Sequence, residues 1–266
     1  MYCYHMTNRS QTSNIGTAER SIQLIEILRR SGGSTAAELA EELPMAKSSI
    51  YKHLNTLNDN NYVTKNGEEY TLSMRFVSIG EEIKQNQINS YQFITNTVKD
   101  IARITEETVW FVVKNGSKGL IVNHEVGNEG IETGRYHPGD QVPLHASASG
   151  KAIFAYLPDD EIDRILANRD LREYTENTTT EIKTIWEELS EVRDRGVAFN
   201  DSESVSNIRA VGVPVLNPTE SVLGALSVSG PKSRIKGEFY KKELPEILIE
   251  KSNLIEINAM ADYRSE

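Results

Sequence analysis

The chain has 266 residues, of which 38% are hydrophobic and 26% charged, and its formal net charge is −10. This length and composition are typical of a globular protein with one large domain or two smaller ones. The sequence excludes a membrane-spanning helix, because no segment approaches the roughly 20 apolar residues that such a helix needs. The N-terminal residues also lack the apolar core of a signal peptide. We therefore expect a cytoplasmic protein without a membrane partner.

Cysteine usage argues against a metal site. Cys3 is the only cysteine, so the chain can form no internal disulfide and no cysteine-based metal centre. His5 lies close to it, but we predict that residues 1–13 form a disordered tail. We expect neither a metal nor another cofactor.

Charge is distributed unevenly along the chain. Residues 1–75 contain eight basic and eight acidic side chains, so the remaining residues carry the whole net charge of −10. Such a difference favours two domains with different partners. The acidic part would repel nucleic acid, whereas the neutral N-terminal part would not.

The first predicted elements are two helices. Thr17 is the predicted N-cap of the first helix, and Gly32 with its neighbouring glycine ends it. Ser34 or Thr35 begins a second, short helix, which ends before Pro44. The two helices together predict the first half of a small helical domain.

A third helix and a β-hairpin complete this predicted domain. The helix spans about Ala46–Asp59, with Ile50, Leu54 and Leu57 in its apolar stripe. An Asn-Gly turn at 66–67 joins the two strands of the hairpin. Three short helices followed by a hairpin predict a winged helix-turn-helix.

The third helix is the predicted recognition helix. The second helix of a helix-turn-helix lies in the major groove, and its early residues contact base edges. Lysine neutralises phosphate, and serine can bond to phosphate or bases. The predicted DNA contacts are Lys47, Ser48, Ser49, Tyr51, Lys52, His53 and Asn55 on the helix and Lys65 on the wing. We expect five of them, Lys47, Ser48, Ser49, Lys52 and His53, to point away from the apolar stripe. The alternative is that they form only the solvated face of an amphipathic helix.

The rest of the chain predicts a mixed α+β domain. Helices are predicted over about Met74–Asn89, Phe93–Ile104, Asp159–Asn168, Glu181–Arg195 and Glu238–Ala261, with one more after Ser147. Strands are predicted over Thr108–Lys114, Gly119–Glu125, Gly196–Asn200, Ala210–Leu216 and Val222–Ser229.

The stretch PLHASASGKAIFAYLP contains a glycine-lysine pair, which raises the question of a phosphate-binding loop. That motif needs a glycine five residues before Gly150, and His145 stands there; Ala152 occupies the Ser/Thr position. A nucleotide site is therefore excluded. Ser147 can instead cap a helix whose first amides, at Ala148 and Ser149, are free to bind a carboxylate or a polar oxygen. The alternative is an ordinary capped core helix.

Several blocks of the sequence resemble the IclR family of transcription regulators. They are AKSSIYKHLNTLNDNNYV, LHASASGKAIFAYL, WEELSEVRDRGVAFNDSE and VGVPVLNPTESVLGALSVSGPKSR, and the resemblance runs from about Ile15 to Ala261. It implies a winged helix-turn-helix DNA-binding domain (residues 14–75), a linker helix (76–90) and a GAF-like effector-binding domain (91–266). Family members bind palindromic operators as dimers or tetramers and respond to small metabolites, commonly organic or aromatic acids.

The resemblance also implies an effector pocket. Carried over position by position, its residues would be Val142, Ala148, Ser149, Asn200, Ile208, Ala210, Ser227 and Ser229. Asn200 stands where some members have an acid, and Ala210 where a cysteine can occur. An amide in place of an acid removes a charge and adds a donor. We therefore expect the effector to differ from the small keto acids of well-known members.

Two further departures concern the backbone. Pro44 replaces a glycine often seen in the helix-turn-helix turn, and Asn207 stands near a position that is usually glycine. Both affect loops rather than the predicted elements.

The leading hypothesis is a transcription factor that binds a palindromic DNA operator as an oligomer and is controlled by a small molecule. A second is an enzyme tethered to a winged helix, for which the sequence offers Ser149, Lys151, His145 and Asp201 without a recognisable spacing. A third is a protein–protein adaptor. The sequence does not distinguish a repressor from an activator.

Overall fold

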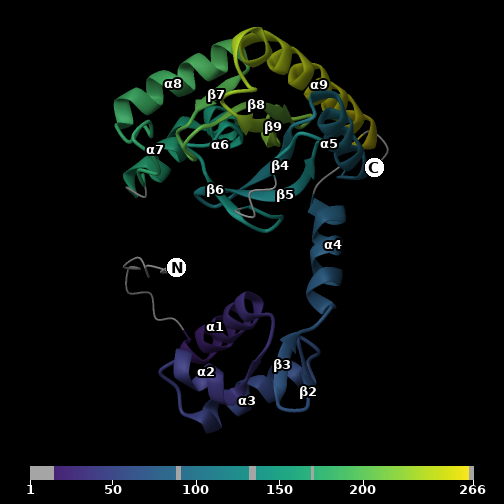
Figure 1. Ribbon diagram of the computed structural model, residues 1–266, viewed down its shortest axis with the longest axis vertical. Coiled ribbons are helices and arrows are strands. Elements are labelled where there is room, and N and C mark those ends of the chain that lie inside the picture. Colours follow the sequence, from purple (N-terminus) through teal and green to yellow (C-terminus); the bar gives the residue numbers. More distant parts are fainter. Residues whose placement is uncertain (1–14, 88–90, 132–135, 169–170, 264–266) are drawn as a thin grey trace. The chain divides into compact units, whose positions relative to one another are not determined.

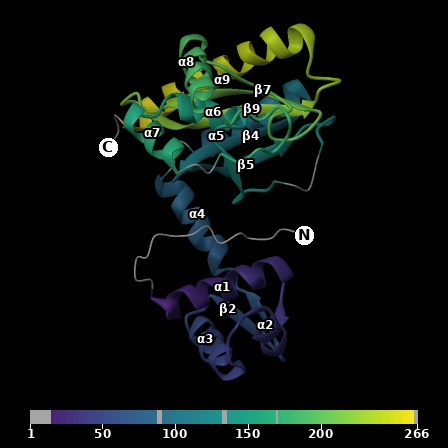
Figure 2. The same ribbon diagram turned by 90° about the vertical axis from the view of Figure 1, so that its left-hand side faces the viewer.

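The computed structural model describes residues 15–87, 91–131, 136–168 and 171–263 (Figures 1 and 2). The chain divides into two compact units, Met1–Ile83 and Lys84–Glu266, and each is described by itself. The predicted tail, with Cys3 and His5, lies outside the described residues.

The N-terminal unit is a winged helix-turn-helix, as predicted. Its elements are α1 (Gly16–Ser31), β1 (Ser34–Thr35), α2 (Ala36–Glu42), α3 (Lys47–Asp59), β2 (Val63–Asn66) and β3 (Glu69–Leu72). The strands form an antiparallel sheet in the order β1-β3-β2, so the predicted hairpin gains a two-residue third strand that the sequence did not indicate. Leu24, Leu39, Ile50 and Leu54 are fully buried and hold the three helices together.

The helix starts of this unit agree only in part with the prediction. Thr17 does not cap α1: the helix begins one residue earlier, its N-cap is Ile15, and the amides of Ala18 and Glu19 donate to the Ile15 carbonyl. The first turn therefore starts without a side-chain cap. Thr35 caps α2 as expected, in a capping box with Glu38.

A helix spans the point at which the two units divide. This helix, α4, runs from Arg75 to Gln87, within the predicted connector Met74–Asn89. The domain boundaries 75/76 and 90/91 stay predictions.

The C-terminal unit is built on a six-stranded sheet in which every neighbouring pair is antiparallel, in the order β6-β5-β4-β9-β8-β7. Its strands are β4 (Thr108–Asn115), β5 (Lys118–Val126), β6 (Gln141–Pro143), β7 (Ala198–Asp201), β8 (Ile208–Leu216) and β9 (Val222–Pro231). The short strand β6 was not predicted. The sheet and its helices together confirm the predicted α+β class.

Helices cover both faces of this sheet (Figure 1). One face carries α5 (Tyr91–Thr105) and α9 (Leu244–Tyr263), which begins after a π-helical turn, η1 (Phe239–Glu243). The other face carries α6 (Ala148–Ala155), with α7 (Asp159–Ala167) and α8 (Ile182–Arg195) beyond it. The helix predicted from Glu238 thus contains a π-helical turn at Phe239–Glu243, and α9 begins at Leu244.

Strands β4 and β9 alternate between the two faces, because successive side chains of a strand point to opposite sides. Leu226 and Val228 join the core beneath α5 and α9, whereas Ser227 and Ser229 face the side of α6. The polar residues of β9 are therefore gathered on one face, close to the start of α6.

Gly212 of β8 allows α6 to begin directly against the sheet. A Cβ atom at this position would lie 2.6 Å from both the carbonyl carbon and the oxygen of Ala148, and 2.9 Å from the nitrogen of Ser149. Such distances are far below van der Waals contact. Only glycine therefore permits this approach of helix to strand.

Candidate functional site

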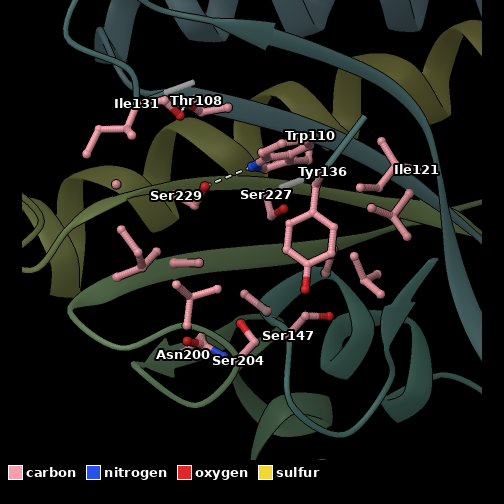
Figure 3. A pocket seen from close by; sticks show the side chains of 18 residues that line it. Thr108, Trp110, Ile121, Ile131, Tyr136, Ser147, Asn200, Ser204, Ser227 and Ser229 are labelled. Atoms are coloured by element: carbon pink, nitrogen blue, oxygen red, sulfur yellow. Dashed lines mark hydrogen bonds between the residues drawn. The ribbon is translucent and has the colours of Figure 1, made fainter. Parts of the chain in front are cut away.

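A cavity lies between the sheet and the N-terminus of α6 (Figure 3). Its volume is about 90 Å³, which is room for several water molecules and thus for a small ligand. All eight residues of the predicted effector pocket line it: Val142, Ala148, Ser149, Asn200, Ile208, Ala210, Ser227 and Ser229. The structure also adds residues that the sequence reasoning did not assign to the pocket: Thr108, Trp110, Val112, Ile121, Ile131, Tyr136, Ser147, Ser204, Val205 and Gly230.

The start of α6 supplies hydrogen-bond donors to this cavity. Ser147 is the N-cap, as predicted: its Oγ accepts from the Gly150 amide (3.0 Å) and donates to the Pro143 carbonyl (2.7 Å). The amides of Ala148 and Ser149 have no hydrogen-bond partner among the residues that the structure describes. Two adjacent free N–H groups at the positive end of a helix are suited to bind a carboxylate or another oxygen.

The opposite wall presents hydroxyl groups beside a large aromatic ring. The indole Nε1 of Trp110 donates to the Oγ of Ser229 at 2.8 Å (Figure 3). Ser227 lies on the same face of β9, two residues earlier, and is almost fully buried. Apart from these groups the lining is mainly apolar, and none of its described residues carries a charge. A ligand here must be held by neutral donors and by apolar contact.

Asn200 lines the cavity as expected, and its side chain also joins two segments of the chain. Its Nδ2 donates to the Ala146 carbonyl (2.6 Å) and its Oδ1 accepts from the Glu203 amide (3.3 Å). The residue is 2% exposed. The amide therefore mainly fastens the segment before α6 to the end of β7, and one N–H at most remains for a ligand.

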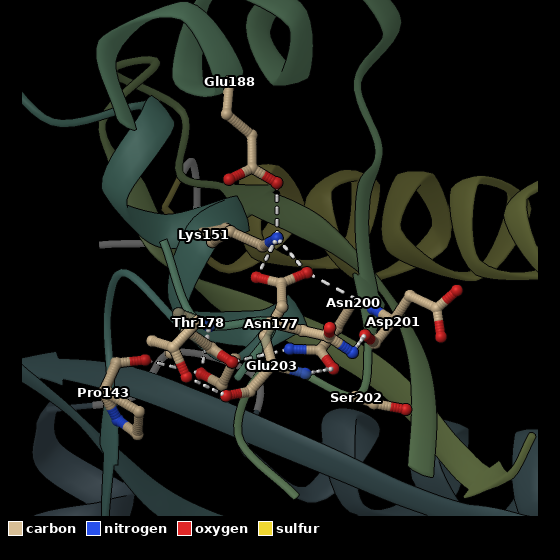
Figure 4. A network of polar contacts seen from close by, with 12 residues as sticks. Pro143, Lys151, Asn177, Thr178, Glu188, Asn200, Asp201, Ser202 and Glu203 are labelled. Atoms are coloured by element: carbon tan, nitrogen blue, oxygen red, sulfur yellow. Dashed lines mark hydrogen bonds and ion pairs between the residues drawn. The ribbon is translucent and has the colours of Figure 1, made fainter. Parts of the chain in front are cut away.

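Lys151 of α6 forms a buried ion network with two carboxylates (Figure 4). Its side chain is 1% exposed, and its Nζ bonds to Glu188 of α8 and to both oxygens of Glu203, at 2.7 and 2.9 Å. Burial raises the pKa of Glu203, although Lys151 opposes that shift. The network joins α6, α8 and the loop that carries Ser204 into the cavity wall.

That loop, residues 202–207, is bounded by two residues in the left-handed region. Ser202 has φ +65° and Asn207 has φ +62°. Asparagine is one of the few non-glycine residues that adopt this conformation readily, so the departure noted at 207 is accommodated.

The four groups offered for an enzyme do not meet. Ser149 lines the cavity, whereas the Nε2 of His145 donates to the Arg172 carbonyl (3.1 Å) and Lys151 is held by its two carboxylates. Asp201 pairs with Arg209 (2.8 Å), which lowers the pKa of the Asp201 carboxyl to about 2. The described residues thus offer no nucleophile–base pair among these four.

The predicted DNA-contact residues, with two exceptions, form an exposed surface of the N-terminal unit. Those exposed are Lys47, Ser48, Tyr51, Lys52 and Asn55 on α3 and Lys65 on β2, while Ser49 is half-buried. Arg29 and Arg30 of α1 form ion pairs with Glu26 and Glu42. The lysines of the predicted contact surface, Lys47, Lys52 and Lys65, form no ion pair with a described residue. Their charges are available to phosphate.

His53 is the second exception, and the expectation that it points away from the apolar stripe is wrong. The residue is 9% exposed, and its Nδ1 is 2.8 Å from the Oγ of Ser21 on α1. His53 lies three residues after Ile50 and four before Leu57, so helical spacing alone could have placed it on the inner face.

Neither a membrane span nor a metal centre is present in the part of the chain that the structure describes. No described helix is long and apolar enough to cross a membrane. No group of three or more His, Cys, Asp or Glu side chains in the described ranges could hold a metal ion.

Comparisons with known proteins agree with this arrangement. The family model described as "Bacterial transcriptional regulator IclR C-terminal" matches residues 85–256, and the "IclR helix-turn-helix domain" model matches residues 17–67. The Halobacterium salinarum protein named "Probable HTH-type transcriptional regulator ArcR" is 27% identical over 253 residues, which cover 94% of this chain and 96% of that protein.

Solved structures show the same fold. The Thermotoga maritima IclR crystal structure matches with a TM-score of 0.78 and 26% identity, over 92% of this chain and 99% of the other. An IclR homologue from Microbacterium hydrocarbonoxydans, solved in complex with 4-hydroxybenzoate, matches with a TM-score of 0.74 over 86% of this chain and 92% of that chain. Its identity is 16%, so this second likeness concerns the fold alone.

Proposed function

Because the chain belongs to the IclR family of transcriptional regulators, we propose that its affinity for an operator is controlled by a small organic acid bound in the cavity at the start of α6. The observation that carries the proposal is the pair of unpartnered amides at Ala148 and Ser149, which open onto that cavity. The helix dipole and the hydroxyls of β9 favour a bound anionic or polar oxygen.

We further propose that α3 and the wing contact DNA through the exposed residues Lys47, Ser48, Tyr51, Lys52 and Lys65, with Ser49 and Asn55 beside them. His53 is left out of these proposed contacts, because its ring is hydrogen-bonded to Ser21. Residues 14–75 would then be the DNA-binding domain, 76–90 the linker and 91–266 the effector-binding domain.

The charge of the DNA-binding part favours an oligomer. Residues 1–75 are formally neutral, so one copy has little excess charge for phosphate. Two copies on a palindrome would add their contacts, and we propose that the chain binds DNA as a dimer or a larger assembly. The ligand would shift the population between states that differ in operator affinity.

The experiment measures DNA binding by fluorescence anisotropy at several salt concentrations, with genomic fragments selected by the protein itself. Lys52→Ala should weaken binding and lower the slope of log K against log salt by about 0.9 for each phosphate that is no longer neutralised. Lys183→Ala is the matched control, since Lys183 is an exposed lysine of α8. An unchanged slope in the Lys52 variant would refute the recognition-helix assignment.

The effector half of the proposal is tested on the same fragments. Benzoate and 4-hydroxybenzoate are the probes, and binding is followed by calorimetry on the full chain. A probe that binds should change the operator affinity. Binding without any change in operator affinity, for every probe that binds, would contradict control by the cavity. A probe that is recovered chemically altered would instead favour the enzyme hypothesis.

A further inference from the structure

We propose that Trp110 determines ligand preference in the cavity and that it selects a planar aromatic acid over a saturated one of the same size. This inference rests on the proposed role of the cavity as an effector site. Trp110 lies on β4, where its Cα partner in the register is Ser227 of β9. Its side chain reaches diagonally to Ser229, the next residue on the same face, which is within reach of a large aromatic side chain.

The first part of the inference concerns the direction of a hydrogen bond. An indole N–H can only donate, so Ser229 Oγ must accept from Trp110 at 2.8 Å. The hydroxyl hydrogen of Ser229 is then left to donate elsewhere, and no described residue accepts it. Ser229 therefore keeps its hydroxyl hydrogen for another acceptor, and a ligand oxygen in the cavity can be that acceptor.

The second part concerns the shape of the wall. The Trp110 ring is held on two sides: it stacks on His124 of β5, with centroids 5.4 Å apart and an interplanar angle of 18°, and meets Tyr136 edge-on at 6.5 Å and 84°. Both Trp110 and Tyr136 line the cavity (Figure 3). Aromatic groups prefer stacked or edge-to-face neighbours. A flat ring in the cavity can make such contacts, and a puckered ring cannot.

The third part concerns the charge of the ligand. The cavity has apolar side chains at Val112, Ile121 and Val142, and none of its described lining residues is charged. Its unpartnered backbone donors lie at the start of α6, at Ala148 and Ser149. One acidic group on an apolar, planar body matches this distribution. A second charged group would have no counter-charge within the lining.

The experiment exploits the two tryptophans of the chain, Trp110 and Trp186. Trp186 lies on α8 and outside the cavity lining, so Trp186→Phe leaves Trp110 as the only indole reporter. Benzoate and cyclohexanecarboxylate are the probes, because they share a carboxylate and six ring carbons and differ in planarity. Binding is followed by Trp110 fluorescence in this variant and by calorimetry in all variants.

We expect Trp186→Phe to bind benzoate about 3- to 10-fold more tightly than cyclohexanecarboxylate. Trp110→Leu removes the ring and should abolish that preference. Trp110→Phe keeps a ring without the N–H: it should keep a preference for benzoate but bind it about 3- to 10-fold more weakly. Ser229→Ala should weaken benzoate similarly. The Trp110→Phe/Ser229→Ala double variant should bind benzoate no more weakly than Ser229→Ala alone, since the Trp110 N–H acts on the ligand only through the Ser229 hydroxyl.

The outcomes separate this inference from the proposed function. Failure of both acids to bind Trp186→Phe would overturn both the inference and the acid-binding cavity. Equal affinity for the two acids, or a preference that survives in Trp110→Leu, would overturn the role of Trp110 alone. If Trp110→Leu does not fold, the Trp110→Phe and Ser229→Ala pair decides: fully additive losses would overturn the inference.

Discussion

Replacing Lys151 by methionine tests the buried ion network. The change removes the cation from between Glu188 and Glu203 but keeps a side chain of similar length. The Lys151 side chain is 1% exposed, and those of Glu203 and Glu188 are 13% and 24% exposed. Two carboxylates would be left facing each other with little solvent to screen them.

The magnitude follows from this burial. Removal of one partner from a buried ion pair costs about 3–5 kcal/mol of unfolding free energy, because the remaining charge is uncompensated. A unit the size of Lys84–Glu266 loses about 2–4 °C in Tm for each kcal/mol. The product is a decrease of about 6–20 °C. The decrease in Tm should be larger at about pH 8 than at about pH 5. Burial raises the pKa of Glu203, and without Lys151 that rise is no longer opposed. A carboxyl whose pKa is raised in the folded state destabilises the fold as the pH rises through that pKa.

The assay is thermal unfolding of the full chain, followed by circular dichroism at both pH values. Lys183→Met is the matched control, since its pair with Glu187 is 3.6 Å apart and the two side chains are 82% and 61% exposed. It should shift Tm by no more than about 2 °C. Adding Glu188→Gln and Glu203→Gln to Lys151→Met should restore part of the lost stability. A Lys151→Met protein as stable as Lys183→Met would refute this reasoning.

Two other predictions concern the same unit. Gly212→Ala should abolish probe binding in calorimetry, because its Cβ, at 2.6 Å, would displace the backbone of Ala148. Operator binding measured in the absence of ligand should not change. Unchanged affinity for the probe would contradict the close approach. Asp201→Asn should flatten the acid side of the stability profile. The Arg209 guanidinium lowers the pKa of Asp201 from 3.8 to about 2, so its contribution is complete above pH 3.8 and is lost as the pH falls toward 2. Tm measured from about pH 5 to about pH 2.5 should fall more steeply in the wild type than in the variant, with exposed Asp160→Asn as the control.

Local signals predicted most of the fold. The spacing of Ile50 and Leu54 and Ser147 as the cap of α6 both act within a few residues, and the structure has both of them. The Asn66-Gly67 signal predicted the hairpin, but its turn lies one residue later, at Gly67-Glu68, and Asn66 is the last residue of β2. Features that depend on distant partners were missed. The two-residue strand β1 exists only because Tyr70 and Glu69 of β3 pair with it, and nothing in its own sequence indicates a strand.

The site shows the same division. The eight pocket residues came from the resemblance, and the start of α6 could also be predicted from its cap. Trp110 could be placed on one face of β4 by alternation with Thr108 and Val112, but alternation does not say which face is lined by the cavity. Lys151 meets Glu188 and Glu203 across 37 and 52 residues of sequence, so no local pattern indicates their contact.

Strands β4 and β9 have a different environment on each face: one face lines the cavity, and the other packs against the apolar core. Ser227 and Ser229 cannot be pulled toward a ligand without carrying Leu226 and Val228, which alternate with them along β9, through the same small displacement. Protein interiors are nearly incompressible, so α5 and α9 must repack to follow. Ligand binding on one face of the sheet would then displace side chains on the other face through the covalent backbone of β9. This coupling would need no hinge or opening gate.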